Sequence, residues 1–101
     1  MQKLGYANSV IYVAPDSLDD LAGPESGVIE LPRTIYWGPE KVVDLEDPVD
    51  VQRMYQALVR IGTVAEQVRW LNRPLLITAW PTLVLPARTS QLWESRFPEL
   101  A

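Results

Sequence analysis

The sequence predicts a small α+β fold, in which an antiparallel sheet or hairpin over about residues 28–45 precedes three or four short packed helices. Short β-branched and aromatic runs fill residues 28–45. From Asp47 onward, apolar residues recur about every 3.6 positions instead of every two. Because 101 residues is the size of one small domain, we expect a single domain, with residues 28–101 as a compact core and residues 1–27 as an arm.

The predicted sheet rests on three β-prone runs, VIEL (28–31), RTIYW (33–37) and KVVDL (41–45). The tetrapeptide WGPE (37–40) is typical of a hairpin connection between the last two runs. In the arm, SVIYVA (9–14) fits a short strand, and PDSLDDLAGPESG (15–27) predicts an acidic loop.

The first helix is predicted over residues 48–61. Asp47 is a favourable N-cap, and Pro48 suits the first helical position. The apolar face at helical spacing consists of Val51, Met54, Tyr55, Leu58 and Ile61. The polar face consists of Gln52, Arg53, Gln56 and Arg60. We expect Gly62 to end this helix in the left-handed conformation.

Shorter helices are predicted after this corner. Thr63 and Glu66 have the spacing of a capping box, which starts a helix over residues 63–72. Asn72 and Pro74 start a helix over residues 74–80, which Pro81 stops. The last helix is expected over residues 86–96.

The composition argues against an enzyme. The chain has no histidine and no cysteine, so the commonest general base, a thiolate nucleophile and the usual transition-metal ligands are missing. The sequence also lacks a glycine-rich phosphate loop and a Gly-x-Ser-x-Gly elbow. An acidic cluster is present, but it lacks EF-hand spacing, and helix capping explains part of it: Asp44, Glu46, Asp47 and Asp50. We therefore expect a non-catalytic protein without cofactor or metal.

Charge and hydropathy bear on the location and the partners. The apolar run over residues 10–14 is too short for a signal-peptide core or a membrane span, so we expect a cytoplasmic protein that does not contact membranes. The net charge of −4 is unevenly placed. Residues 1–47 hold three basic and nine acidic side chains, whereas residues 48–101 hold six arginines and four acidic side chains. These arginines either solvate helix faces or contact carboxylates or phosphates of a partner.

Trp70 raises the main functional question. At 100° per residue, Val64, Val68 and Leu71 share one side of the helix over 63–72, and Trp70 falls nearly opposite. Either a neighbouring segment covers Trp70, or Trp70 is a surface anchor for a partner. Tryptophan and arginine are enriched at interface hot spots. The predicted partner-binding residues are therefore Trp70, Arg69, Arg73, Trp37 and Tyr36.

The corner between the first two helices, residues 52–71, also resembles a helix-turn-helix DNA-binding motif. Gly62, Val68 and Leu71 fit the motif, but Leu58 stands where a small residue is expected. The candidate nucleic-acid contacts are Arg60, Arg69 and Arg73. Such a regulator would bind operator DNA as a homodimer. A pI near 4.6 is unlike the basic footprint of DNA-binding proteins, which favours a helical corner without DNA.

The segment from Leu31 to Glu94 resembles a group of short bacterial proteins. The resemblance lies in LPRTIYWGPEKVVDLEDP, MYQALVRIGTVAEQVRWLN and LLITAWPTLVLPARTSQLWE. The group carries a Leu-Pro/aromatic-Trp hairpin, a Gly-Thr helical corner and a Trp-Pro-x-Leu-x-Leu-Pro segment, and it is associated with partners of toxins, including nucleotidyltransferase-type toxins. The resemblance implies a non-catalytic interaction module of the antitoxin type, which binds and neutralises a toxin. A DNA-binding transcriptional regulator is the alternative, and many antitoxins do both.

Overall fold

The structure is a computed structural model that describes residues 13–32 and 42–101. Two short strands, β1 (Val28–Glu30) and β2 (Val42–Asp44), pair in antiparallel register, with Ile29 opposite Val43. Four helices follow: α2 (Pro48–Ile61), α3 (Val64–Trp70), α4 (Arg73–Ala79) and α5 (Ala87–Arg96). The short 3-10 turns are η1 (Leu18–Asp20), η2 (Trp80–Thr82) and η3 (Pro98–Leu100). The predicted α+β fold, a small antiparallel sheet followed by helices, is confirmed.

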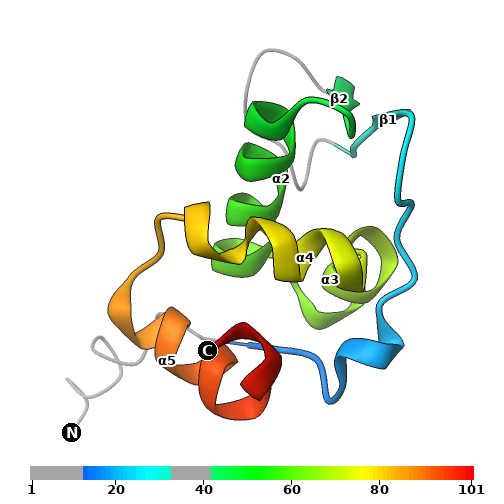
Figure 1. The fold of residues 1–101 in the computed structure, drawn as a ribbon. Helices are drawn as coiled ribbons and strands as arrows, with labels where there is room; N and C mark the ends of the chain where they lie inside the picture. The colour runs from blue at the N-terminus through cyan, green and yellow to red at the C-terminus, as the bar shows by residue number, and fades with distance from the viewer. Residues whose placement is uncertain (1–12, 33–41) are drawn as a thin grey trace, which may run out of the picture.

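The helices pack around one apolar cluster to which every helix except α3 contributes a fully buried side chain from within its bounds. Figure 1 shows the sheet and the start of α2 at one end of the molecule and α5 at the other, with α3 and α4 between them. The largest side chains with no exposed surface in this cluster are Trp93, Tyr55, Met54, Leu58, Leu71 and Leu76. The core therefore lies between α2, α4 and α5, and α3 covers one side of it.

The predicted caps of α2, α3 and α4 form, whereas α5 begins after Pro86 without a side-chain cap. The Asp47 side chain accepts a hydrogen bond from the Val49 N–H at 2.9 Å, and Pro48 is the first residue of α2. The Asn72 side chain accepts from the Leu75 N–H at 3.2 Å at the start of α4. Such caps satisfy amides that have no partner within the helix, each stabilising by about 1 kcal/mol.

Two details of α2 differ from the prediction. Gly62 is not left-handed: its φ and ψ are −72° and 154°, an extended conformation open to any residue. Glycine is required there by space instead, because a Cβ would lie 2.6 Å from the Leu58 carbonyl oxygen. Ile61, predicted on the apolar face, is 64% exposed, since α2 ends before the next helix can cover that side.

The segment before β1 packs against the helices over its described part. Ala14 and Leu18 belong to the buried cluster, and the Arg96 guanidinium donates to the Ala14 carbonyl at 3.1 Å. Figure 1 shows this segment running from beside α5, past α3, to β1. Residues 13 and 14 form no strand; the rest of the predicted strand over 9–14 and the predicted WGPE connection lie outside the described residues.

Candidate partner-binding surface

Helix α3 carries two of the predicted contact residues, and hydrogen bonds fix its first turn. The Thr63 hydroxyl accepts from the Glu66 N–H at 3.1 Å, and the Glu66 carboxylate accepts from the Thr63 N–H at 2.9 Å. This is the predicted capping box, and it is confirmed. The helix therefore begins at a defined residue directly after the Gly62 corner.

The segment before β1 fixes the other end of α3. The Ala22 N–H donates to the Val68 carbonyl and the Gly23 N–H donates to the Leu71 carbonyl, both at 2.8 Å. A Cβ at Gly23 would lie 2.2 Å from the Trp70 carbonyl oxygen, so only glycine allows this approach. Both ends of α3 are thus held, which positions its surface side chains on a rigid support.

Gln67 decides which face of α3 is buried. Its side chain has no exposed surface, and its amide donates to the Leu58 carbonyl at 3.0 Å and to the Gly62 carbonyl at 3.3 Å. The Leu58 carbonyl also accepts the Gly62 N–H at 3.0 Å, so the Gln67 amide is its second donor, whereas Gly62 follows the last residue of α2. These hydrogen bonds offset the cost of burying the side-chain nitrogen, whereas the buried Gln67 side-chain oxygen has no hydrogen-bond partner among the described residues.

The buried face is consequently rotated from the predicted one. Gln67 and Leu71 are fully buried, whereas Val64, predicted on the buried side, is 40% exposed. At 100° per residue, Trp70 lies about 60° from Gln67, on the flank of the buried face and not opposite it. Trp70 is partly buried and packs against the core.

Arg69 covers the Trp70 ring from the solvent side. The central guanidinium carbon lies 4.4 Å from the ring centroid, and the Arg69 side chain is exposed. This cation–π contact stabilises an exposed pair by about 0.5–1 kcal/mol. The two residues therefore form a preorganised Arg–Trp pair at the edge of the core.

Arg73, at the first position of α4, is engaged within the chain. Its guanidinium lies 3.2 Å from a Glu99 carboxylate oxygen and 3.7 Å from an Asp19 carboxylate oxygen. Hydrogen bonds from the Glu99 backbone N–H and from Arg73 lower the pKa of the Glu99 carboxyl. The Arg73 side chain is 44% exposed, so it is accessible but already paired. We call Arg69, Trp70 and Arg73 together the α3 surface.

The other predicted contacts lie elsewhere. Arg60 is exposed in the last turn of α2, where it makes no ion pair with a described residue. Trp37 and Tyr36 lie outside the described residues. The structure therefore brings Arg69 and Trp70 into contact and places Arg73 in an ion-pair network with Asp19 and Glu99.

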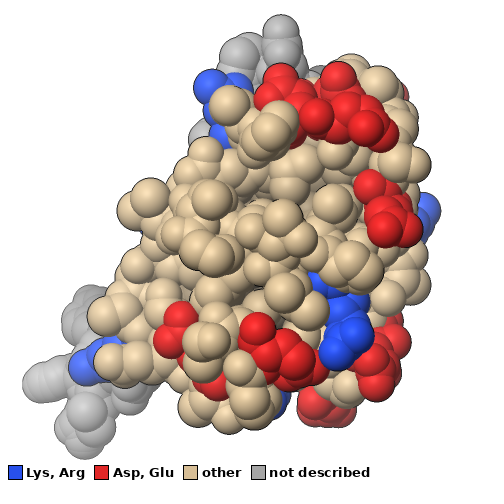
Figure 2. Space-filling view, in the orientation of Figure 1, with Lys and Arg blue, Asp and Glu red and all other residues tan. Residues whose placement is uncertain are grey.

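The acidic cluster at the start of α2 serves the local backbone. Asp44, Asp47 and Asp50 each accept a hydrogen bond from a backbone N–H, at 2.9 to 3.0 Å. Within residues 13–32 and 42–101, no group of three or more acidic side chains is arranged to hold a metal ion. Figure 2 shows acidic side chains over this end of the molecule and over the α5 end, with an uncharged surface over α4 between them.

Sequence reasoning missed Gln67 and the hydroxyl of Tyr55. The buried Tyr55 hydroxyl accepts from the Asn72 N–H at 2.9 Å and so connects α2 to the start of α4. Burial raises the pKa of Tyr55 to about 12. Neither role follows from helical periodicity, because a glutamine at this position scores as a surface residue and a tyrosine as plain apolar.

Comparison of the chain with protein families, curated proteins and solved structures gives no match. Among the described residues, no helix has the length and apolar character needed to span a membrane.

Proposed function

We propose that the protein is a non-catalytic protein-interaction module that binds a protein partner through the α3 surface. The observation that carries this proposal is the Arg69–Trp70 pair, with the guanidinium 4.4 Å from the ring centroid on an exposed edge. Arginine and tryptophan are the residue types that most often dominate interface energies. Few side chains on a small domain combine this chemistry with exposure.

Rigid support favours binding by this pair. Association costs about 0.5–1.5 kcal/mol for each flexible side chain that it immobilises. Here the capping box and the Ala22–Gly23 hydrogen bonds hold both ends of α3, and the Trp70 ring packs against the core. The pair therefore loses less conformational freedom on binding than two free surface side chains would lose.

The proposed partner is basic, and an antitoxin-like role fits this. The chain carries a net charge of −4, and its acidic side chains gather at both ends of the face in Figure 2. Complementary charge speeds association, while buried aromatic anchors slow dissociation. A toxin that acts on nucleic acids or nucleotides has a basic cleft, which an acidic partner of this kind would cover.

The DNA-binding alternative is less well supported by the charges around α3. Arg73 is paired with Asp19 and Glu99, which compensates the charge that would attract a phosphate. On α3 itself the exposed positions are Val64, Ala65 and Arg69. This short helix would therefore present only one exposed basic side chain to a DNA groove. Sequence-specific readers rely on several polar or basic side chains from the recognition helix.

The test is a comparative pull-down from nuclease-treated cells, using wild type, Trp70→Ala and the control Arg88→Ala. Arg88 is exposed on α5, outside the α3 surface. We expect wild type and Arg88→Ala to retain one stoichiometric protein, and Trp70→Ala to lose it. The binding free energy for that protein should be weaker by about 2 kcal/mol or more in Trp70→Ala. Expressed alone, that protein should inhibit growth, and wild type should relieve the inhibition.

Three outcomes contradict the proposal. Retention of the same partner by Trp70→Ala would remove Trp70 from the interface. A Trp70→Ala variant that is unfolded at the assay temperature would show that Trp70 acts in the core. An empty pull-down that retains DNA without nuclease would favour the regulator, and neutralising Arg69 and Arg73 should then flatten the salt dependence of operator binding.

A further inference from the structure

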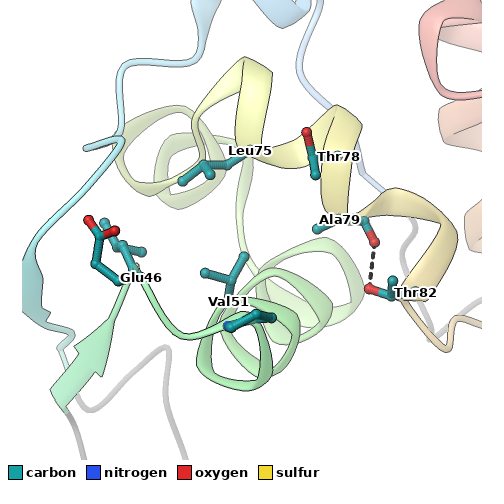
Figure 3. A pocket seen from close by; sticks show the side chains of 8 residues that line it. Glu46, Val51, Leu75, Thr78, Ala79 and Thr82 are labelled. Atoms are coloured by element: carbon teal, nitrogen blue, oxygen red, sulfur yellow. Dashed lines mark hydrogen bonds between the residues drawn. The ribbon is translucent and has the colours of Figure 1, made fainter.

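A pocket of about 240 Å³ lies between the start of α2 and α4, away from the α3 surface. Figure 3 shows side chains from both elements around it, with Val51 of α2 facing Leu75 of α4 and Glu46 at one side. Pockets for drug-sized ligands occupy about 300–1,000 Å³. This pocket is smaller, and its size suits a single side chain of a partner.

The pocket walls are apolar. Leu45, Val51, Leu75 and Ala79 contribute aliphatic surface, and residues 74–87 contain no charged side chain. The Thr82 hydroxyl donates to the Ala79 carbonyl at 2.7 Å, so it is already satisfied within the wall. A hydrocarbon chain placed here would be removed from water, and the hydrogen bond of the Thr82 hydroxyl would stay intact.

Glu46 places a negative charge at the pocket. Its neighbours Asp44, Asp47 and Asp50 use their carboxylates to accept backbone hydrogen bonds. The exposed Glu46 carboxylate makes no such bond or ion pair with a described residue. Of the four acidic side chains, Glu46 is therefore the one that the local backbone does not use.

The helix dipole of α2 does not reverse this charge. The N-terminus of a helix carries about half a positive elementary charge. Asp47 at the N-cap and Asp50 in the first turn outweigh it. The Glu46 end of the pocket consequently remains negative and favours a cation.

We propose that this pocket takes a lysine or arginine side chain from a basic protein partner. The hydrocarbon stem would lie against Val51, Leu75 and Ala79, and the cationic end would meet the Glu46 carboxylate in water. Basic side chains commonly bury their stems and keep their charge hydrated in this way. The inference rests on the proposed function for the existence of a protein partner, but it assigns a second contact that does not involve the α3 surface.

The test is a chemical-shift titration of the ¹⁵N-labelled full chain with capped single amino acids. The probes are the N-acetyl methylamides of lysine, norleucine and glutamate; norleucine has the lysine stem without its charge. We expect the lysine probe to shift the amides of Thr78, Ala79 and Thr82. It should bind about threefold more tightly than norleucine, as an exposed ion pair allows, and the glutamate probe should not bind.

Three variants make the test specific. Glu46→Gln should reduce lysine affinity to the norleucine level, whereas the control Glu25→Gln, an exposed acid outside the pocket, should change nothing. Thr78→Phe, at an exposed lining position, should fill the pocket and abolish binding of both probes. Lysine binding that is unchanged in Glu46→Gln, or an absence of shifts at the lining residues, would overturn the inference. Because Arg69 and Trp70 are untouched, such a failure would leave the pull-down result standing.

Discussion

Trp70 and Trp93 show two uses of the same residue type in one small chain. Trp93 has no exposed surface and packs between Trp80, with ring centroids 6.0 Å apart, and Phe97, at 5.6 Å. Trp70 lies on the flank of α3, partly buried, with the Arg69 guanidinium over its ring. The difference teaches that burial on every side makes a tryptophan a determinant of stability, whereas burial on one side leaves part of its surface available to the proposed partner.

Removing Trp93 should have the largest effect on stability. Trp93→Ala leaves a cavity among aromatic side chains and is expected to lower the free energy of unfolding by about 3–5 kcal/mol. Urea denaturation of the variant and the wild type measures this. A loss of less than about 1 kcal/mol would contradict the assignment of Trp93 to the centre of the buried cluster.

The next largest effect on stability is expected at high pH, through the Tyr55 hydroxyl that connects α2 to the start of α4. Tyr55 has its pKa raised to about 12 by burial, from about 10 in the unfolded chain. Its neutral form is therefore favoured by folding; this stabilisation is complete below pH 10 and is lost as pH rises through about 12. The loss amounts to about 2–3 kcal/mol at most. The free energies of unfolding of wild type and Tyr55→Phe should be measured between pH 9 and pH 12. We expect the two stability curves to converge as pH rises. Parallel curves would contradict the stabilising role of the neutral Tyr55 hydroxyl.

Removing the buried Gln67 amide that supports α3 should lower the free energy of unfolding by a similar or smaller amount. Gln67→Met keeps the approximate shape of the side chain but leaves the buried Gly62 carbonyl without the Gln67 donor, while the Leu58 carbonyl keeps the Gly62 N–H. We expect a loss of about 2 kcal/mol, typical for an unsatisfied buried polar group. Chemical denaturation tests this, with Gln91→Met as an exposed control on α5. Equal stability of Gln67→Met and wild type would show that shape alone positions α3.

The sequence predicted the elements better than their faces. The caps at Asp47, Thr63 and Asn72 are local, so the helix starts could be located without the fold. The buried face of α3 depends on the Gln67 amide meeting carbonyls of α2, a tertiary contact that periodicity does not encode. Trp70 therefore lies on the flank of the buried face and not nearly opposite it as expected, and its contact with Arg69 was not predicted.

The smallest expected effect on stability belongs to Arg69, and it allows the most direct test. Arg69→Ala removes a cation–π contact from an exposed position, so the free energy of unfolding should change by no more than about 1 kcal/mol. With the partner identified by pull-down, calorimetry should compare the affinities of wild type, Arg69→Ala and Arg88→Ala. We expect Arg69→Ala to bind at least about tenfold more weakly, a loss of about 1.4 kcal/mol, while Arg88→Ala binds as wild type does. Equal affinity of Arg69→Ala and wild type, with both folded, would contradict the assignment of the α3 surface as the binding site.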